Sequence, residues 1–140
     1  MAEIQIHHFK RAHIDAALQL WSTMDEIGLS ASDTPERIER FLKANSGLSF
    51  VAMAGGELAG ALLCGHDGRR GYIHHLAVAP GYRSKGVGRQ LVERALNGLR
   101  KLDILKCHLF VFRCNAVGDN FWARLGWQRR EELLLYSQYL

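Results

Sequence analysis

The sequence has few cysteines, the residues whose disulfides cross-link small secreted proteins. Its 140 residues include only three cysteines, Cys64, Cys107 and Cys114, and no C-x-x-C motif. An odd number of thiols cannot all pair. Cys107 and Cys114 are seven residues apart in a strand-like stretch, which places their side chains on opposite faces. We therefore expect reduced thiols in a reducing compartment, and hence a cytoplasmic protein rather than a disulfide scaffold.

Long hydrophobic runs and a strong charge of one sign are also absent. Apolar runs such as residues 109–112 and 133–136 are far shorter than the roughly 20 residues of a membrane-spanning helix. Residues 1–10 lack the apolar core of a secretory signal. Lys plus Arg number 18 against 14 Asp plus Glu, a net charge of +4. This excess suits an anionic ligand but is too dispersed to indicate nucleic acid. We expect neither a membrane nor a nucleic acid as partner.

What the sequence does contain is enough apolar material for one core. Hydrophobic residues make up 48% and charged residues 23%, which suits one domain over residues 1–140. Strand-like patterns and turn residues, among them Gly55-Gly56, predict strands at residues 3–9, 48–54, 57–65, 71–78, 106–112 and 130–139. Helical periodicity and capping residues, among them Thr34 followed by Pro35, predict helices at residues 11–28, 34–44, 86–102 and 117–125. This order predicts a mixed sheet flanked by helices, an α/β domain in three layers.

The most informative segment is a glycine-rich turn between the strand at 71–78 and the helix that follows. Arg83, Lys85 and Arg89 surround Gly86 and Gly88. Unpaired N–H groups at a helix start attract anions, and glycine lets a phosphate approach the backbone closely. The segment therefore predicts a phosphate site. The order Ser-Lys-Gly at 84–86 excludes a P-loop, and Leu91 stands where the dinucleotide fingerprint requires a third glycine.

Two motifs resemble those of the GNAT acetyltransferase superfamily. Arg83-x-x-Gly86-x-Gly88 after Leu76-Ala77-Val78 resembles its acetyl-CoA signature. Residues 111–115, VFRCN, and 121–127, FWARLGW, resemble a second family segment downstream. The resemblance covers nearly the whole chain. It implies a GNAT-like α/β/α fold with a mostly antiparallel sheet whose central strands splay apart.

The resemblance also implies where acetyl-CoA, the co-substrate, would bind. The main chain of Leu76, Ala77 and Val78 would pair with the pantetheine arm, and a backbone N–H near Leu76 or Ala77 would bind the acetyl oxygen. Asn115 would contact the cofactor near its thiol. The pyrophosphate would lie on the loop and helix start formed by Arg83, Ser84, Lys85, Gly86, Val87, Gly88 and Arg89.

Candidate catalytic residues lie on the strand before the signature. A protonated amine must lose a proton before it attacks, and freeing its lone pair at pH 7 costs about 4–5 kcal/mol. Tyr72 and His74 share one face of the predicted strand, and His74 is our preferred base because its pKa is near neutrality. By the same alternation we expect His75 to face the other side. The alternative is that these histidines are simply packed.

Two positions depart from the family pattern. Trp122 stands where the usual tyrosine acid would be, and Phe110 matches the glutamate base of the ribosomal-protein N-terminal acetyltransferases. An indole N–H is not a usable acid. Water, Tyr136 or Tyr139 would then have to complete a proton relay, or the chemistry is slow or lost.

Three functional hypotheses therefore remain. The leading one is direct transfer of an acetyl group from acetyl-CoA to a primary amine of a small molecule or peptide. The others are a non-catalytic acyl-CoA-binding module and a nucleic-acid-binding domain. No metal is expected, because neighbouring histidines such as His74 and His75 should point to opposite faces of a strand. The acceptor is not identified, and whether the chain forms a homodimer is left open.

Overall fold

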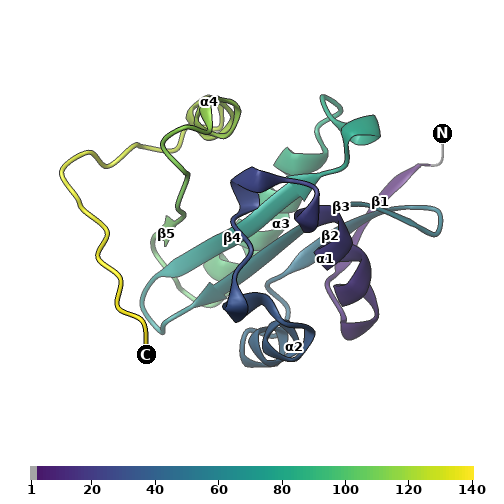
Figure 1. Ribbon diagram of the computed structural model, residues 1–140, viewed down its shortest axis with the longest axis horizontal. Helices are drawn as coiled ribbons and strands as arrows, with labels where there is room; N and C mark the ends of the chain where they lie inside the picture. Colours follow the sequence, from purple (N-terminus) through teal and green to yellow (C-terminus); the bar gives the residue numbers. More distant parts are fainter. Residues whose placement is uncertain (1–2) are drawn as a thin grey trace. The chain divides into compact units, whose positions relative to one another are not determined.

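The structure is a computed structural model that describes residues 3–140 (Figure 1). The chain divides into two compact units, residues 1–110 and residues 111–140. The first unit holds the sheet and most of the core, and the second holds one helix and the C-terminal segment. That residues 1–140 act as one functional domain stays a prediction.

The first unit is built on a five-stranded mixed sheet in the order β1-β2-β3-β4-β5. The first four strands pair antiparallel, and β4 and β5 pair parallel. Gly55, at a φ of +62°, makes the predicted turn between β2 and β3. The bounds of the strands are β1 Ile4–His8, β2 Phe50–Ala54, β3 Glu57–His66, β4 Gly71–Val78 and β5 Cys107–His108. The α/β fold class predicted from the sequence is confirmed.

Helices cover both faces of this sheet, with α1 and α2 on one face and α3 on the other (Figure 1). As the Thr-Pro pair predicts, the Thr34 hydroxyl caps α2 by accepting from the N–H of Arg37 at 3.2 Å. The helix bounds are α1 Ile14–Ser22, α2 Pro35–Ala44 and α3 Val87–Lys101. Short 3-10 turns precede α1 and α2 and lie before α3: η1 Arg11–His13, η2 Asp25–Ile27, η3 Ala31–Asp33 and η4 Pro80–Tyr82.

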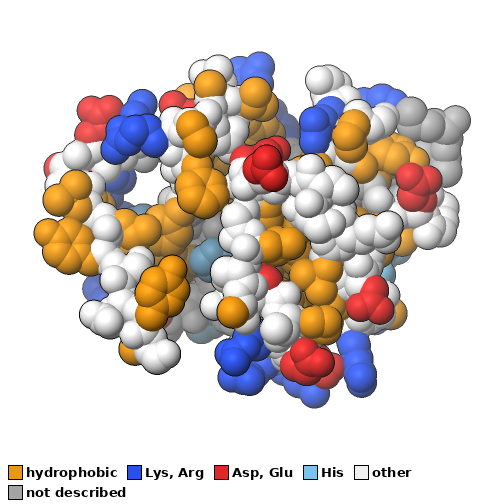
Figure 2. Space-filling view, in the orientation of Figure 1, with side chains coloured by type: hydrophobic (Ala, Val, Ile, Leu, Met, Phe, Trp, Pro, Cys, Tyr) orange, Lys and Arg blue, Asp and Glu red, His pale blue; other side chains and the backbone are white. Residues whose placement is uncertain are grey.

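The core on the α1/α2 face is apolar. Trp21 from α1 is 1% exposed and packs with Val51 and Leu63 of the sheet and Ile38 of α2. The outer side of α2 carries charges of both signs, which lie side by side at the lower edge of the face shown in Figure 2. Hydrophobic burial against the sheet therefore fixes which side of α2 faces inward.

Gly65 allows α2 to lie directly on β3. A Cβ atom at this position would lie 2.8 Å from Phe41 Cζ and 2.8 Å from Asn45 Cγ. Asn45 cannot move away without breaking two hydrogen bonds. Its Oδ1 accepts from the N–H of His66 at 3.0 Å, and its Nδ2 donates to the carbonyl of Phe41. The absent side chain thus sets the distance between helix and sheet.

We expect Gly65→Ala to lower the free energy of unfolding by about 1–3 kcal/mol, the usual cost of overpacking. Urea denaturation monitored by tryptophan fluorescence measures it. Gly56→Ala is the matched control, since a Cβ there meets nothing within 4 Å and should change stability by less than about 0.5 kcal/mol. Equal stability of the two variants would contradict this packing.

All three cysteines are free thiols. Burial is the main cause that raises the pKa of Cys64 to about 12 and of Cys107 to about 11. Both are therefore protonated at neutral pH and packed rather than nucleophilic. Cys114 is exposed.

The second unit contains α4, Ala116–Arg124, which Asn115 caps by accepting from the N–H of Gly118 at 2.9 Å. The prediction of a strand at residues 130–139 is wrong, because residues 125–140 form turns and extended coil. Exposed local ion pairs, Arg129–Glu131 and Arg130–Glu132, lie in this segment. A strand needs a paired partner, and in the described residues it has none, so the apolar residues at 133–136 are exposed.

The strand expected at residues 106–112 is also shorter in the structure, and only Cys107–His108 pairs with β4. In the part of the chain described, no helix combines the length and apolar character required to cross a membrane.

Candidate functional site

The outer edge of β4 offers main-chain groups to a ligand. β5 pairs with β4 only at Gly71 and Tyr72, whereas β4 continues to Val78. Within residues 3–140, no strand pairs with this edge from Ile73 to Val78. An edge strand of this kind presents N–H and C=O groups ready for an added extended chain. This geometry agrees with the splayed sheet expected from the resemblance.

A candidate anion-binding loop, residues 83–89 and called here the cradle, follows at the end of β4. The loop enters α3 through two residues with positive φ, Ser84 at +62° and Gly86 at +80°. Gly86 is the N-cap of α3, with no side-chain cap and no acidic residue in the first turn. The first N–H groups of a helix carry the positive end of its dipole. The exposed side chain of Arg89 adds a positive charge, so this helix start suits a phosphate.

Arg83 has a structural task beside the cradle. Its Nε donates to the carbonyl of Val78 at 2.9 Å, and Nη2 approaches Met24 Sδ at 3.9 Å. The guanidinium therefore ties the loop back to the end of β4. It orients the cradle as well as adding charge to it.

A β-bulge lies in the middle of β4 and changes the position of His75. Ala61 pairs with Ala77 but Leu63 pairs with His74, so β4 holds one extra residue here. His75 takes a φ of +56°, in the left-handed region. Non-glycine residues in this region are strained and often mark functional sites.

The bulge brings the His74 and His75 side chains to the same face of the sheet. The ring of His75 packs against Trp21 of α1 at 5.1 Å, and the ring of His74 meets Phe41 of α2 at 6.0 Å. The two imidazole centroids are 6.5 Å apart. The prediction that they point to opposite faces is therefore wrong, because the extra residue resets the alternation. Residues 3–140 nevertheless contain no group of three or more His, Cys, Asp or Glu placed to hold a metal ion.

His75 is held by a carboxylate that the sequence analysis missed. Asp33 Oδ1 lies 2.8 Å from His75 Nε2, and the two side chains are only 11% and 16% exposed. The other oxygen of Asp33 accepts from the N–H of Ser30 at 3.0 Å. The signal was available as the capping-box spacing Ser-x-x-Asp at residues 30–33. This pair connects the loop before α2 to the bulge in β4.

Burial sets the protonation state of His74. Burial lowers its pKa below the ordinary value of 6.5, and the neighbouring His75 lowers it further, with Asp33 acting in the opposite direction. His74 is therefore neutral at pH 7 and keeps a lone pair. It shares its face of β4 with Tyr72, whose ring lies nearly parallel at 6.4 Å.

The sequence-predicted residues of the second unit have local roles. The carboxamide oxygen of Asn115 is engaged in capping α4, which leaves its Nδ2 to offer a ligand. Trp122 packs edge to face with Phe121 at 5.0 Å and with Trp127 at 5.0 Å. The indole serves as packing within its own unit.

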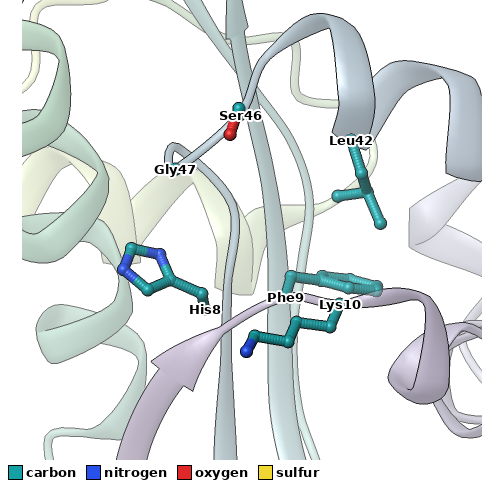
Figure 3. Close-up of a pocket in the computed structure, with 6 residues that line it drawn as sticks. All are labelled: His8, Phe9, Lys10, Leu42, Ser46 and Gly47. Atoms are coloured by element: carbon teal, nitrogen blue, oxygen red, sulfur yellow. The ribbon is translucent and has the colours of Figure 1, made fainter.

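A surface pocket of about 300 Å³ lies elsewhere in the first unit, at the end of β1 (Figure 3). It is lined by His8, Phe9, Lys10, Leu42, Ser46 and Gly47. The ring of His8 packs on Phe50 at 4.9 Å. None of the sequence motifs reaches this pocket, so the edge of β4 and the start of α3 remain the candidate site.

Comparison with known proteins agrees with this geometry. Residues 14–127 match the model of the acetyltransferase (GNAT) family. An acetyltransferase of Sodalis glossinidius is 29% identical over 138 residues, covering 98% of this chain and 96% of that protein. An acetyltransferase of Pectobacterium atrosepticum is 30% identical over 126 residues, covering 89% and 88%. Aminoglycoside N-acetyltransferase AAC(6')-Iy, solved in complex with CoA, shares the fold at 18% identity and a TM-score of 0.80, covering 100% of this chain and 97% of that one.

Proposed function

Because this chain belongs to the GNAT acetyltransferase family, we propose that it transfers the acetyl group of acetyl-CoA directly to a primary amine. One arrangement supports the proposal: three features follow one another along β4 and the start of α3. They are the unpaired edge of β4, the bulge with two histidines and the helix start without a side-chain cap. Binding, oxyanion stabilisation and proton transfer each have a matching group on that path.

The chain's own groups fit acetyl-CoA, which supplies the activated acetyl group. The pyrophosphate lies on the N–H groups at the start of α3, next to Arg89. The pantetheine arm pairs with the main chain of Leu76 to Val78 as an added strand. This path brings the thioester to the bulge, where a main-chain N–H near Leu76 or Ala77 stabilises the negative charge that develops on the acetyl oxygen.

His74 then takes the proton of the attacking amine, directly or through water. Its lowered pKa keeps it in the neutral, accepting form at pH 7. Tyr72 lies beside it and can join a proton relay through its hydroxyl. His75, bonded to Asp33, fixes the shape of the bulge and the position of its neighbour. The departing thiol, with a pKa near 8.5 in a model cysteine, needs little acid help, so Trp122 does not prevent turnover.

Titration calorimetry with acetyl-CoA and with CoA, followed by thiol detection with a panel of amines, tests this function. We expect micromolar binding of both and release of CoA thiol that depends on the amine. Binding without amine-dependent thiol release would instead support a non-catalytic acyl-CoA-binding module. Absence of binding would show that the glycine turn is only structural.

A further inference from the structure

We propose that the acceptor is a monoamine carried on an aromatic ring by a short chain, and that its ring stacks on an aromatic surface beside His74. This surface, called here the ring row, consists of Phe41, Tyr72, His74, His108 and Phe110. The inference deepens the proposed function and rests on it. It names the acceptor class by the chemistry of the surface next to the proton acceptor.

The central ring of the row is that of Tyr72. The rings of His74 and Phe110 each lie 6.4 Å from it, with interplanar angles of 10° and 17°. His108 lies 5.7 Å from Tyr72, tilted by 44°. Phe41 closes one end edge-on to His74, at 6.0 Å and 79°. Nearly parallel rings favour a flat ligand that adds another ring by offset stacking.

The backbone explains why these rings gather. Tyr72 and His74 alternate on β4, and His108 is the parallel partner of Tyr72 in β5. Phe110 lies two residues beyond His108, so in an extended segment it shares that face. Phe41 reaches the row only because Gly65, the β3 partner of Tyr72, has no side chain. Residues of β4, of β5 and the segment just after it, and of α2 therefore form a single aromatic surface.

The row is open to a ligand at one end. Phe110 is 60% exposed, and Tyr72 and His108 are partly exposed, whereas a ring that served only as core would be buried. Covering such a ring removes apolar area from water and therefore favours the binding of an apolar ligand. The opposite end reaches His74, the proton acceptor, so a ligand ring on Tyr72 and Phe110 places a side-chain amine toward the bulge.

Charge favours a single amine over a polycation. Asp33, the carboxylate nearest the histidines, is already bonded to His75 and Ser30. The exposed acids Asp25 and Glu26 lie in η2, directly after Met24, which contacts Arg83 at the cradle end of β4. The ring row itself contains no carboxylate. It attracts one ammonium group by the faces of its rings and offers few partners to the many ammonium groups of an aminoglycoside.

The test compares amines with and without an aromatic ring. With acetyl-CoA saturating, kcat/KM is measured for 2-phenylethylamine, tryptamine, hexylamine and kanamycin. We expect kcat/KM for 2-phenylethylamine and for tryptamine to be at least tenfold higher than for hexylamine and kanamycin. The difference should come from a lower KM. Values for hexylamine or kanamycin equal to or above those of the aromatic amines would overturn the inference while leaving the proposed function intact.

Two variants show whether the ring row causes the preference. Phe110→Ala should raise KM for 2-phenylethylamine at least fivefold and change kcat less than twofold. It should raise KM for hexylamine less than twofold, because the hexyl chain loses only apolar contact and no ring stacking. Leu105→Ala, which removes an 89% exposed apolar side chain in the loop before β5, is the control and should change neither value. Equal effects of the two variants, or an equal effect of Phe110→Ala on both amines, would overturn the assignment.

A binding experiment separates the inference from the transfer reaction. 2-Phenylethylamine is titrated into the protein–CoA complex, and the aromatic proton signals of Tyr72 and Phe110 are followed by NMR. Saturable shifts that Phe110→Ala weakens support the ring row even if no thiol is released, in which case only the proposed transfer fails. If acetyl-CoA binds but the amine neither binds nor reacts, the inference fails.

Discussion

Replacing Gly86 by aspartate is expected to lower the affinity for acetyl-CoA at least about 100-fold, equivalent to about 2.7 kcal/mol. Gly86 is the N-cap of α3 at a φ of +80°. A carboxylate there would occupy the positive end of the helix and repel the pyrophosphate from the groups meant to hold it. Calorimetric titration with acetyl-CoA measures the change.

The control is Gly86→Asn, which has nearly the same shape and no charge. Asparagine and aspartate both tolerate a left-handed conformation better than most residues, and a Cβ at residue 86 meets nothing within 4 Å. Both variants should therefore fold, and Gly86→Asn should weaken binding less than tenfold. Gly88→Asp, at the buried second residue of α3, should also prevent binding. If Gly86→Asp and Gly86→Asn bind acetyl-CoA equally well, the cradle assignment is wrong.

The cradle illustrates which parts of the fold can be predicted from sequence. Its signals are local: a strand ends, glycines allow positive φ, and helical periodicity begins within a few residues. The structure has β4 at Gly71–Val78 and α3 at Val87–Lys101, close to the predicted ranges. The Thr34 cap of α2 and the Gly55 turn are also confirmed, because capping and turn formation depend on neighbours in the chain.

The bulge at His75 shows why the site itself could be predicted only in part. Strand alternation predicts a single histidine on the α1/α2 face, whereas one extra residue in β4 brings His74 and His75 there together. The bulge is a feature of the pairing between β3 and β4, and His75 within it bonds to the Asp33 carboxylate, 42 residues earlier in the chain. Such long-range contacts do not change the hydrophobic pattern of the sequence near residue 75, so that pattern cannot predict the bulge. The short β5 has the same cause, since pairing rather than local pattern decides how far a strand extends.

His74→Gln is expected to lower kcat for amine acetylation by about 10²- to 10⁴-fold, the usual contribution of a general base. Glutamine keeps a polar group of similar reach but cannot accept a proton at neutral pH. The dissociation constant of acetyl-CoA should change less than twofold, because the cradle lies on α3. Steady-state kinetics and calorimetry on the same preparation separate the two effects. His7→Gln, an exposed histidine on β1, is the matched control and should retain wild-type kinetics.

The pH dependence identifies which histidine acts. The neutral, accepting form of His74 is lost as pH falls through its folded pKa, which burial and His75 hold below 6.5. In the wild type, kcat/KM should therefore fall on an acidic limb below that pH, and in His74→Gln this limb should disappear. His75→Gln removes a group that lowers the pKa of His74, so the limb should remain and move to higher pH. An acidic limb that persists unchanged in His74→Gln would exclude His74 as the base, and a limb lost only in His75→Gln would assign the role to His75.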